Sequence, residues 1–289
     1  MQHKQIRKTM KIKLNSKFDY KVVWRTHNIC NFSCPYCFQK NSNDLKKIDN
    51  YYSIINKIIN KINNELKTLN NKKIEIAFMG GEPTLINLYD IIKKIDPKNN
   101  FISFKIFTNF SASLEKYKKI FSLEKNNKKI GLSISIHDDI INFDNYINKA
   151  LKLKKNIFNM SIVVLTEKNY INFLKYRAIF KNIKIIPQLC REYSNYNSFA
   201  KIITPQEIIK KLPEHFKKEY VLNNIIITKD EIFADKILNN KKKICTPKTE
   251  IYSDGTISDC SKNLRDKIFV TDIICNKDIC SIDCIYVTI

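Results

Sequence analysis

Three cysteines stand close together near the start of the chain, in the run Cys30-Asn31-Phe32-Ser33-Cys34-Pro35-Tyr36-Cys37. The spacing C-x3-C-x2-C lets three thiolates hold three corners of a [4Fe–4S] cube and leaves one iron open. A structural zinc site is the alternative, with His27 as a candidate for the fourth ligand. The run directly follows a segment with strand composition. We therefore expect the cysteines at the carboxyl end of a sheet, where ligands of parallel α/β proteins gather.

A second motif, Met79-Gly80-Gly81-Glu82-Pro83, ends the next predicted strand. Two adjacent glycines allow a ligand to approach the backbone closely, and Glu82 could pair with a ligand ammonium group. Pro83 suits the first position of the following helix. Taken alone, the segment could be an ordinary strand-to-helix turn. The chain has only four glycines, however, and two of them stand one strand after the cysteine run, which favours a ligand site.

The end of the chain holds a second group of cysteines. Its members are Cys245, Cys260, Cys275, Cys280 and Cys284. The segment Ile251–Ser258 contains Asp254-Gly255 and predicts a β-hairpin, which would bring Cys245 and Cys260 together. Iron–sulfur and zinc ligation both remain open for this group. Cys190 stands alone after the sixth predicted strand, and it could be a catalytic group or a small apolar filler.

Strand-like and helix-like segments alternate between residues 20 and 190. The predicted strands are Tyr20–Arg25, Lys73–Phe78, Phe101–Phe107, Ile130–Ile136, Asn159–Leu165 and Ile183–Leu189. The predicted helices are 51–66, whose apolar residues recur at 3–4 spacing, Leu85–Ile95, Leu114–Phe121, Ile140–Leu153 and Tyr170–Phe180. Such alternation indicates an α/β fold with a parallel sheet and right-handed crossovers. Six units are too few for an eight-stranded barrel, so we expect an open or partial (β/α)6 barrel.

Composition narrows the class of protein. The chain carries 51 Lys+Arg against 28 Asp+Glu, yet only five of the basic residues are arginines and the lysines are spread over every segment. Since specific nucleic-acid sites favour arginine, this pattern argues against a nucleic-acid partner. No apolar run is long enough to span a membrane and no signal peptide is visible, so we expect a cytoplasmic protein. Nine cysteines in a reducing compartment indicate metal ligands or catalytic groups.

At these motifs the chain resembles the radical S-adenosylmethionine (SAM) superfamily. The family's C-x3-C-x-aromatic-C loop matches Cys30, Cys34, Tyr36 and Cys37. Its Gly-Gly-Glu-Pro strand end, which binds the SAM amino group, matches residues 80–83. The resemblance covers roughly residues 20–190 and includes the partial barrel. It implies a [4Fe–4S] cluster whose open iron is chelated by the amino and carboxylate groups of SAM.

The resemblance also suggests contacts that each have an ordinary alternative. Ser135 ends the fourth strand, where the family often contacts the SAM ribose, but it could instead bond to backbone. Asn109, in Thr108-Asn109, could line the site or cap a turn. Tyr36 could lie beside the adenine or serve packing. The fifth strand ends in the apolar segment Ile162–Leu165, so no SAM contact is assigned there.

The end of the chain resembles the auxiliary-cluster domains of this family, the SPASM domain or its shorter twitch form. The run Cys245-x9-Gly255-x4-Cys260 matches their opening signature. Because five thiolates are too few for two clusters, we expect one auxiliary [4Fe–4S] cluster, held by Cys245, Cys260 and two of the last three cysteines. The implied division is an extension at 1–19, a radical SAM core at 20–190, a linker and helical connection at 191–243, and a SPASM/twitch-like domain at 244–289.

The resemblance implies reductive cleavage of SAM to methionine and a 5′-deoxyadenosyl radical, which abstracts a hydrogen from a substrate C–H bond. The leading hypothesis is modification of a peptide or protein side chain, by oxidation or cross-linking. The alternative is a small-molecule dehydrogenase or epimerase acting on a sugar or aminocyclitol. A non-catalytic iron–sulfur or zinc module for electron transfer or scaffolding is a third hypothesis. An electron donor such as flavodoxin or ferredoxin is implied, and no membrane partner is expected.

Overall fold

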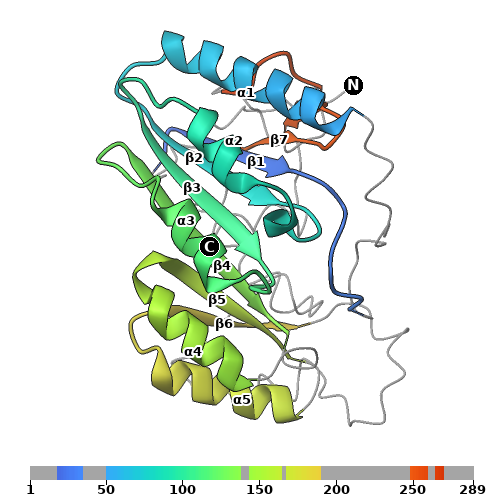
Figure 1. Cartoon of the computed structure of the whole chain (residues 1–289), viewed down its shortest axis with the longest axis vertical. Helices are drawn as coiled ribbons and strands as arrows, with labels where there is room; N and C mark the ends of the chain where they lie inside the picture. The colour runs from blue at the N-terminus through green and yellow to red at the C-terminus, as the bar shows by residue number, and fades with distance from the viewer. Residues whose placement is uncertain are drawn as a thin grey trace, which may run out of the picture.

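The computed structural model describes residues 18–34, 50–137, 143–164, 167–189, 248–259 and 264–269 (Figure 1). Its strands are β1 (Tyr20–Arg25), β2 (Lys73–Met79), β3 (Phe101–Thr108), β4 (Lys128–Ile136), β5 (Ile157–Val164), β6 (Lys184–Leu189), β7 (Thr249–Ile251) and β8 (Ile257–Asp259). Its helices are α1 (Tyr51–Thr68), α2 (Leu88–Lys94), α3 (Leu114–Phe121), α4 (Phe143–Leu153) and α5 (Glu167–Ile179), with short 3-10 turns η2 (Pro83–Leu85) and η3 (Lys154–Asn156).

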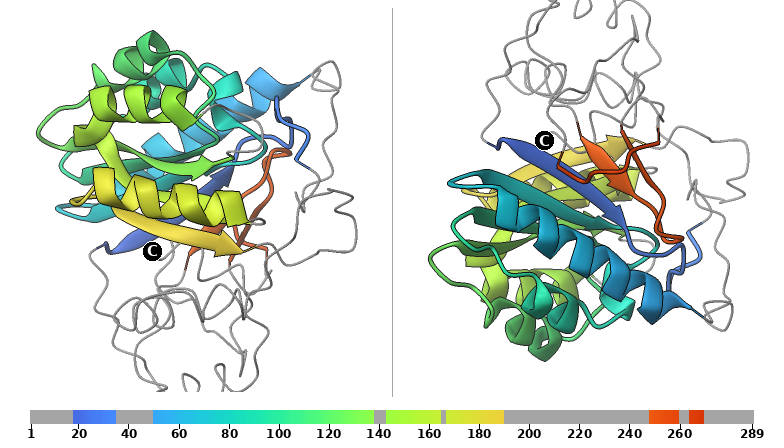
Figure 2. Two further views of the ribbon diagram at one scale, coloured as in Figure 1. Left: turned by 90° about the horizontal axis from the view of Figure 1, so that it is seen from below. Right: turned by 90° about the horizontal axis from the view of Figure 1, so that it is seen from above.

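The strands form one sheet in the order β6-β5-β4-β3-β2-β1-β7-β8. The first six strands run parallel in chain order, each joined to the next through a helix, as the alternating sequence pattern predicts. Lys105 of β3 has a lowered pKa because it is desolvated, and the charges of Lys21 in β1 and Lys184 in β6 lower it further. Strands from opposite ends of the parallel order therefore face a common interior (Figure 2), and this α/β arrangement fits a partial barrel.

The two faces of the sheet differ in chemistry because strand side chains alternate. Outward-facing residues such as Ile74, Ile76 and Phe78 are fully buried beneath the helices. Helix α1 covers them with an apolar stripe that lies on one face, as its 3–4 spacing predicts. The buried members of that stripe are Tyr51, Ile55, Ile58, Ile59, Ile62 and Leu66. The inner face instead carries small and polar residues, among them Lys105 and Ser133. Apolar burial thus holds the helices on one side and leaves polar groups on the other.

The starts of helices α2 and α5 each differ by three residues from the sequence-based expectations. The predicted helix Leu85–Ile95 is wrong at its start, because the chain first makes the turn η2 and then re-enters a helix at Leu88. Asn87 causes the break, since its side chain caps the new helix by accepting a hydrogen bond from the Asp90 amide. Helix α5 begins three residues earlier than predicted, at Glu167. Within the described part of the chain, no helix combines the length and the apolar character needed to cross a membrane.

The predicted hairpin is confirmed, with β7 and β8 antiparallel around Asp254-Gly255. Gly255 adopts a φ of 86°, a left-handed conformation that suits glycine. Its location was not foreseen: β7 pairs in parallel with β1 and extends the main sheet. The cysteine-rich domain remains a prediction, because Cys245, Cys260, Cys275, Cys280 and Cys284 lie outside the described residues.

The junction between β1 and β7 is built around the carboxylate of Glu250. Lys248 Nζ lies 3.0 Å and Arg25 Nε 3.4 Å from its two oxygens, and the Tyr252 hydroxyl donates to it at 2.9 Å. Burial raises the pKa of Glu250, but these cations and hydrogen bonds outweigh burial and lower it to about 2. Its ionised form therefore helps to fasten the hairpin to the core.

Glu250→Gln should lower the free energy of unfolding at neutral pH by roughly 2–3 kcal/mol. Because the folded pKa lies below the unfolded value, this contribution is complete above about pH 4.5 and is lost as the pH falls toward 2. Denaturant unfolding of both proteins at a series of pH values should show the difference shrinking over that interval. The exposed Glu115→Gln serves as the control, and an equal effect there would contradict the assignment.

Candidate active site at the carboxyl ends of the strands

The loop that carries Cys30 and Cys34 follows β1 directly and is clamped onto the Gly80-Gly81 turn after β2. The Gly81 amide donates to the His27 carbonyl at 2.8 Å, and the Glu82 amide donates to the Ile29 carbonyl at 2.7 Å. A Cβ atom on Gly80 would lie 2.2 Å from the His27 oxygen, and one on Gly81 would lie 1.9 Å from the Ile29 oxygen. The two glycines thus allow the backbone of the cysteine loop to pack closely against this turn. The sequence had suggested that they make room for a ligand.

The Glu82 side chain points into the protein and is fully buried. Its carboxylate accepts hydrogen bonds from the Thr84 amide at 2.9 Å, the Thr84 hydroxyl at 2.5 Å, the Thr108 hydroxyl at 2.8 Å and the Asn109 amide at 2.6 Å. Burial raises the pKa of Glu82, and these four donors oppose that effect. The carboxylate that the sequence suggested for a ligand ammonium group therefore joins the ends of β2 and β3.

Asn109 stands immediately after β3 and reaches the cysteine loop. Its side-chain nitrogen lies 3.6 Å from Cys30 Sγ and 3.0 Å from Asn31 Oδ1. Its backbone is held on both sides, because the amide donates to Glu82 and the carbonyl accepts from the Tyr146 hydroxyl at 2.8 Å. The sequence left open whether Asn109 lines the site or caps a turn. It does both, since its side-chain oxygen also accepts from the Ser111 amide.

His137 follows β4 and meets the second cysteine. Its Nδ1 atom lies 3.7 Å from Cys34 Sγ, and its ring packs edge-on against Phe32 with centroids 5.8 Å apart. Burial lowers the pKa of His137 to about 4, so the imidazole is neutral at pH 7. The ends of three strands, β1, β3 and β4, thereby converge on the sulfur atoms of Cys30 and Cys34.

The other predicted site residues fall into two groups. Ser135 lies on the inner face near the end of β4, with its hydroxyl 3.5 Å from that of Ser161 in β5, and Pro83 opens the turn η2. Tyr36, Cys37 and Cys190 lie outside the described residues. The structure therefore brings Cys30, Cys34, Asn109 and the Gly-Gly turn together at one edge of the sheet, with Ser135 on the adjoining face.

Comparison with known proteins decides the family. The model of the radical SAM superfamily matches residues 24–193, more than half of the chain. The chain belongs to the radical SAM superfamily. A cysteine-type anaerobic sulfatase-maturating enzyme of Clostridium perfringens is 25% identical over 271 residues, covering 82% of this chain and 73% of the relative. The enzyme of the same description from Clostridium novyi is 23% identical over 276 residues, covering 82% and 72%.

Membership of the radical SAM superfamily implies a [4Fe–4S] cluster and SAM, and the observed donor groups fit them. Cys30 and Cys34 are partly exposed and lie at the carboxyl end of the sheet. Nitrogen atoms of Phe32, Asn109 and His137 lie 3.4–3.7 Å from their sulfurs, where N–H groups can stabilise the negative charge of thiolates. The described portion therefore contains two suitable ligands, and the third cysteine of the motif, Cys37, lies beyond it.

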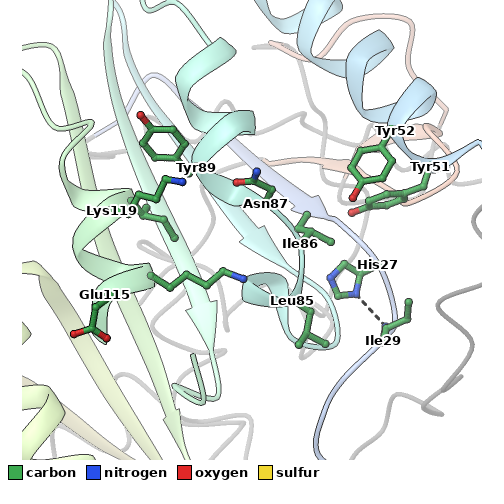
Figure 3. Close-up of a pocket in the computed structure, with 12 residues that line it drawn as sticks. His27, Ile29, Tyr51, Tyr52, Leu85, Ile86, Asn87, Tyr89, Glu115 and Lys119 are labelled. Carbon is green, nitrogen blue, oxygen red and sulfur yellow. Dashed lines mark hydrogen bonds between the residues drawn. The ribbon is translucent and has the colours of Figure 1, made fainter. Parts of the chain in front are cut away.

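A cavity of about 620 Å³ lies on the helix side of this radical SAM core, behind the cysteine loop (Figure 3). Its lining residues come from the loop after β1, the start of α1, the η2–α2 segment and α3: His27, Ile29, Tyr51, Tyr52, Leu85, Ile86, Asn87, Tyr89, Glu115, Lys116, Lys119 and Ile120. Burial lowers the pKa of His27 to about 4, and its Nδ1 accepts from the Ile29 amide. His27 thus supports the loop structurally. Of the predicted SAM contacts that the structure describes, none lines this cavity.

Several residues that build the site were not identified from the sequence. Thr84 and Thr108 hold Glu82, and Tyr117 in turn contacts the Thr108 hydroxyl at 3.0 Å. Asn31 joins the cysteine loop to Asn109. Threonines and asparagines near strand ends are common turn residues, so no local signal separates these from others. Only the meeting of β2, β3 and the cysteine loop reveals their roles.

Proposed function

We propose that this radical SAM enzyme modifies a side chain of a peptide or protein. The observation that supports this substrate class is the similarity to two cysteine-type anaerobic sulfatase-maturating enzymes. It covers 82% of the chain, so it extends beyond the superfamily match at residues 24–193. The names of these relatives make a cysteine side chain of a protein the first substrate to test.

In this proposal Cys30, Cys34 and Cys37 hold the cluster, and Asn109, Ser135 and Tyr36 contact SAM. The Gly80–Pro83 turn contacts SAM through its backbone, because the Glu82 carboxylate is already bonded to Thr84, Thr108 and Asn109. When bound, the cluster supplies an electron, and SAM supplies the radical that removes a hydrogen atom from the substrate. The chain's own contribution is positional: the Gly-Gly clamp and the buried Glu82 fix the cysteine loop against the ends of β2 and β3. Polar groups of the inner face offer hydrogen bonds that can orient a polar substrate.

The polar residues of the inner face come from adjacent strands. Ser133 of β4 donates to the Asn159 side chain of β5, and both are buried. Lys105 of β3 and Glu75 of β2 lie on the same face, and the Glu75 charge favours the protonated form of Lys105. These buried groups make the lining of the inner face polar, with both donors and acceptors.

We further propose that Cys245, Cys260 and two of Cys275, Cys280 and Cys284 hold one auxiliary [4Fe–4S] cluster. Such a cluster could accept an electron from the substrate and complete a net oxidation. Iron analysis after anaerobic reconstitution tests this directly. About eight irons per chain are expected for two clusters, whereas about four would contradict the auxiliary cluster.

The decisive experiment is anaerobic reconstitution of the full chain followed by incubation with SAM, a strong reductant and cysteine-containing peptides. We expect formation of 5′-deoxyadenosine and a peptide whose changed mass maps to one side chain. Cys30→Ala should reduce 5′-deoxyadenosine to the level without enzyme, because a cluster ligand is lost. Ser111→Ala, a change in a nearby loop residue, is the matched control.

Two results would contradict the proposal at different levels. An intact cluster that yields no 5′-deoxyadenosine would exclude the radical enzyme. Cleavage of SAM that modifies no peptide but dehydrogenates or epimerises a sugar or aminocyclitol would exclude the peptide substrate and support the small-molecule alternative.

A further inference from the structure

Two side chains from different strands place nitrogen atoms beside the cysteine sulfurs. Asn109 Nδ2, after β3, lies 3.6 Å from Cys30 Sγ, and His137 Nδ1, after β4, lies 3.7 Å from Cys34 Sγ. The Phe32 amide adds a backbone donor to Cys30 at 3.4 Å. Asn109 thus approaches Cys30, and His137 approaches Cys34. These two side chains are 28 positions apart in the sequence, so the fold brings them together at the loop.

The direction of these hydrogen bonds follows from the chemistry of the ligand. A cysteine that binds iron is a thiolate and has no proton to donate. Asn109 approaches through its amide nitrogen, which can only donate. His137 contacts the sulfur of Cys34 through Nδ1, and this nitrogen must carry a proton if it is to bond to a thiolate. Both side chains would thus direct an N–H group at a sulfur of the cluster.

We propose that Asn109 and His137 are positioning residues that donate hydrogen bonds to the cluster's cysteine sulfurs and thereby raise its reduction potential. The inference rests on the proposed function, in which Cys30 and Cys34 bind the cluster. Reduction adds negative charge to the cluster, and N–H groups directed at its sulfurs stabilise that charge. Their loss should make the cluster harder to reduce.

Both donors are held in place by contacts within the chain. The backbone of Asn109 is fixed by Glu82 and Tyr146, and its side-chain oxygen accepts from the Ser111 amide at 3.0 Å. Only its nitrogen end is then directed at the cysteine loop. His137 packs edge-on against Phe32, itself a residue of that loop. Such support keeps a hydrogen bond at its working geometry without further ordering of the side chain.

The test is a redox titration of the anaerobically reconstituted full chain, followed by electron paramagnetic resonance. The signal of this cluster is identified by its change when SAM is added, which separates it from an auxiliary cluster. His137→Phe keeps an aromatic ring against Phe32 but removes the N–H group, and Asn109→Leu removes the amide. We expect each to decrease the equilibrium constant for one-electron reduction roughly tenfold, a shift of about 59 mV to lower potential.

His137→Gln retains an N–H donor and should return the potential toward that of the unmodified chain. Ser111→Ala is the matched control, because the Ser111 hydroxyl donates to Asn31 Oδ1 at 3.3 Å and its removal leaves the N–H groups of Asn109 and His137 in place. Iron content is measured for every protein. Unchanged potentials in His137→Phe and Asn109→Leu, an equal shift in Ser111→Ala, or equal loss of iron in His137→Phe and His137→Gln would each overturn the inference. Failure of the unmodified chain to form a SAM-responsive cluster would instead overturn the proposed function, and this inference with it.

Discussion

Replacing Gly81 by alanine should largely abolish cluster binding and lower stability. The added Cβ would lie 1.9 Å from the Ile29 oxygen, 2.2 Å from the Ile29 carbonyl carbon and 2.8 Å from the Cys30 amide nitrogen. These atoms belong to backbone that the Gly81 and Glu82 amides hold in place, so no side-chain rotation can relieve the overlap. The cysteine loop must therefore move away from the turn.

We expect Gly81→Ala to cost about 3 kcal/mol of unfolding free energy, the upper part of the range for overpacked positions. For a domain of this size, that corresponds to a melting temperature lower by roughly 6–12 °C. Iron content after anaerobic reconstitution and thermal unfolding are the measurements. Both should fall together, since one displacement of the loop causes both effects.

Gly131→Ala is the matched control, because an added Cβ there also meets an obstacle, but of a different kind. It would lie 2.4–2.5 Å from ring atoms of Phe158, the far end of a side chain that can turn aside. Gly131→Ala should therefore lose stability while retaining iron. If Gly81→Ala also kept a full complement of iron and normal SAM cleavage, the clamp would have no role in holding the cysteine loop.

We also expect Glu82→Gln to have a large effect on stability and on SAM cleavage. The carboxylate accepts from four donors, one of them on Oε2 and three on Oε1. A glutamine amide has only one acceptor oxygen, so in either orientation its NH2 group faces a donor. If that group lies near Asn109, the Asn109 amide is left without an acceptor in a fully buried site.

We expect Glu82→Gln to lower the free energy of unfolding by about 3 kcal/mol, through the unsatisfied donor and the loss of charge-assisted hydrogen bonds. The end of β3 should loosen as well, which would displace Asn109 from the cysteine loop and reduce SAM cleavage. Denaturant unfolding and 5′-deoxyadenosine formation measure the two effects. The exposed Glu115→Gln should stay within about 0.5 kcal/mol. An equally mild result for Glu82→Gln would contradict the structural role of this buried carboxylate.

Much of the core fold could be predicted because it depends on local patterns. β1 has the predicted bounds, and the other five parallel strands begin and end within two residues of the expected positions. The alternation of strand-like and helix-like segments and the 3–4 spacing of apolar residues in α1 involve residues that are close in the sequence. Both patterns can therefore be recognised from the sequence alone. The helix after β2 was wrong at its start, because the cap at Asn87 competes with the apolar periodicity that continues through Leu85.

The sequence predicted which residues belong to the candidate site better than it predicted which atoms they contact. The C-x3-C-x2-C spacing and the Gly-Gly pair marked the correct strand ends, because a motif shows its residue types in a short stretch. Which atoms the glycines and Glu82 contact could not be predicted, since those partners lie on other elements. The Glu82 carboxylate meets Thr108 and Asn109, 26 and 27 positions away.

Local sequence patterns were sufficient to predict the parallel α/β order and a cysteine loop beside a Gly-Gly turn. Three features became visible only in the folded chain: Glu82 faces inward, the hairpin extends the sheet beside β1, and His137 meets Cys34 across 103 positions. The physical reason is that such contacts depend on the register and curvature of the whole sheet. These arise from burial of one complete face beneath the helices, and no short segment specifies them.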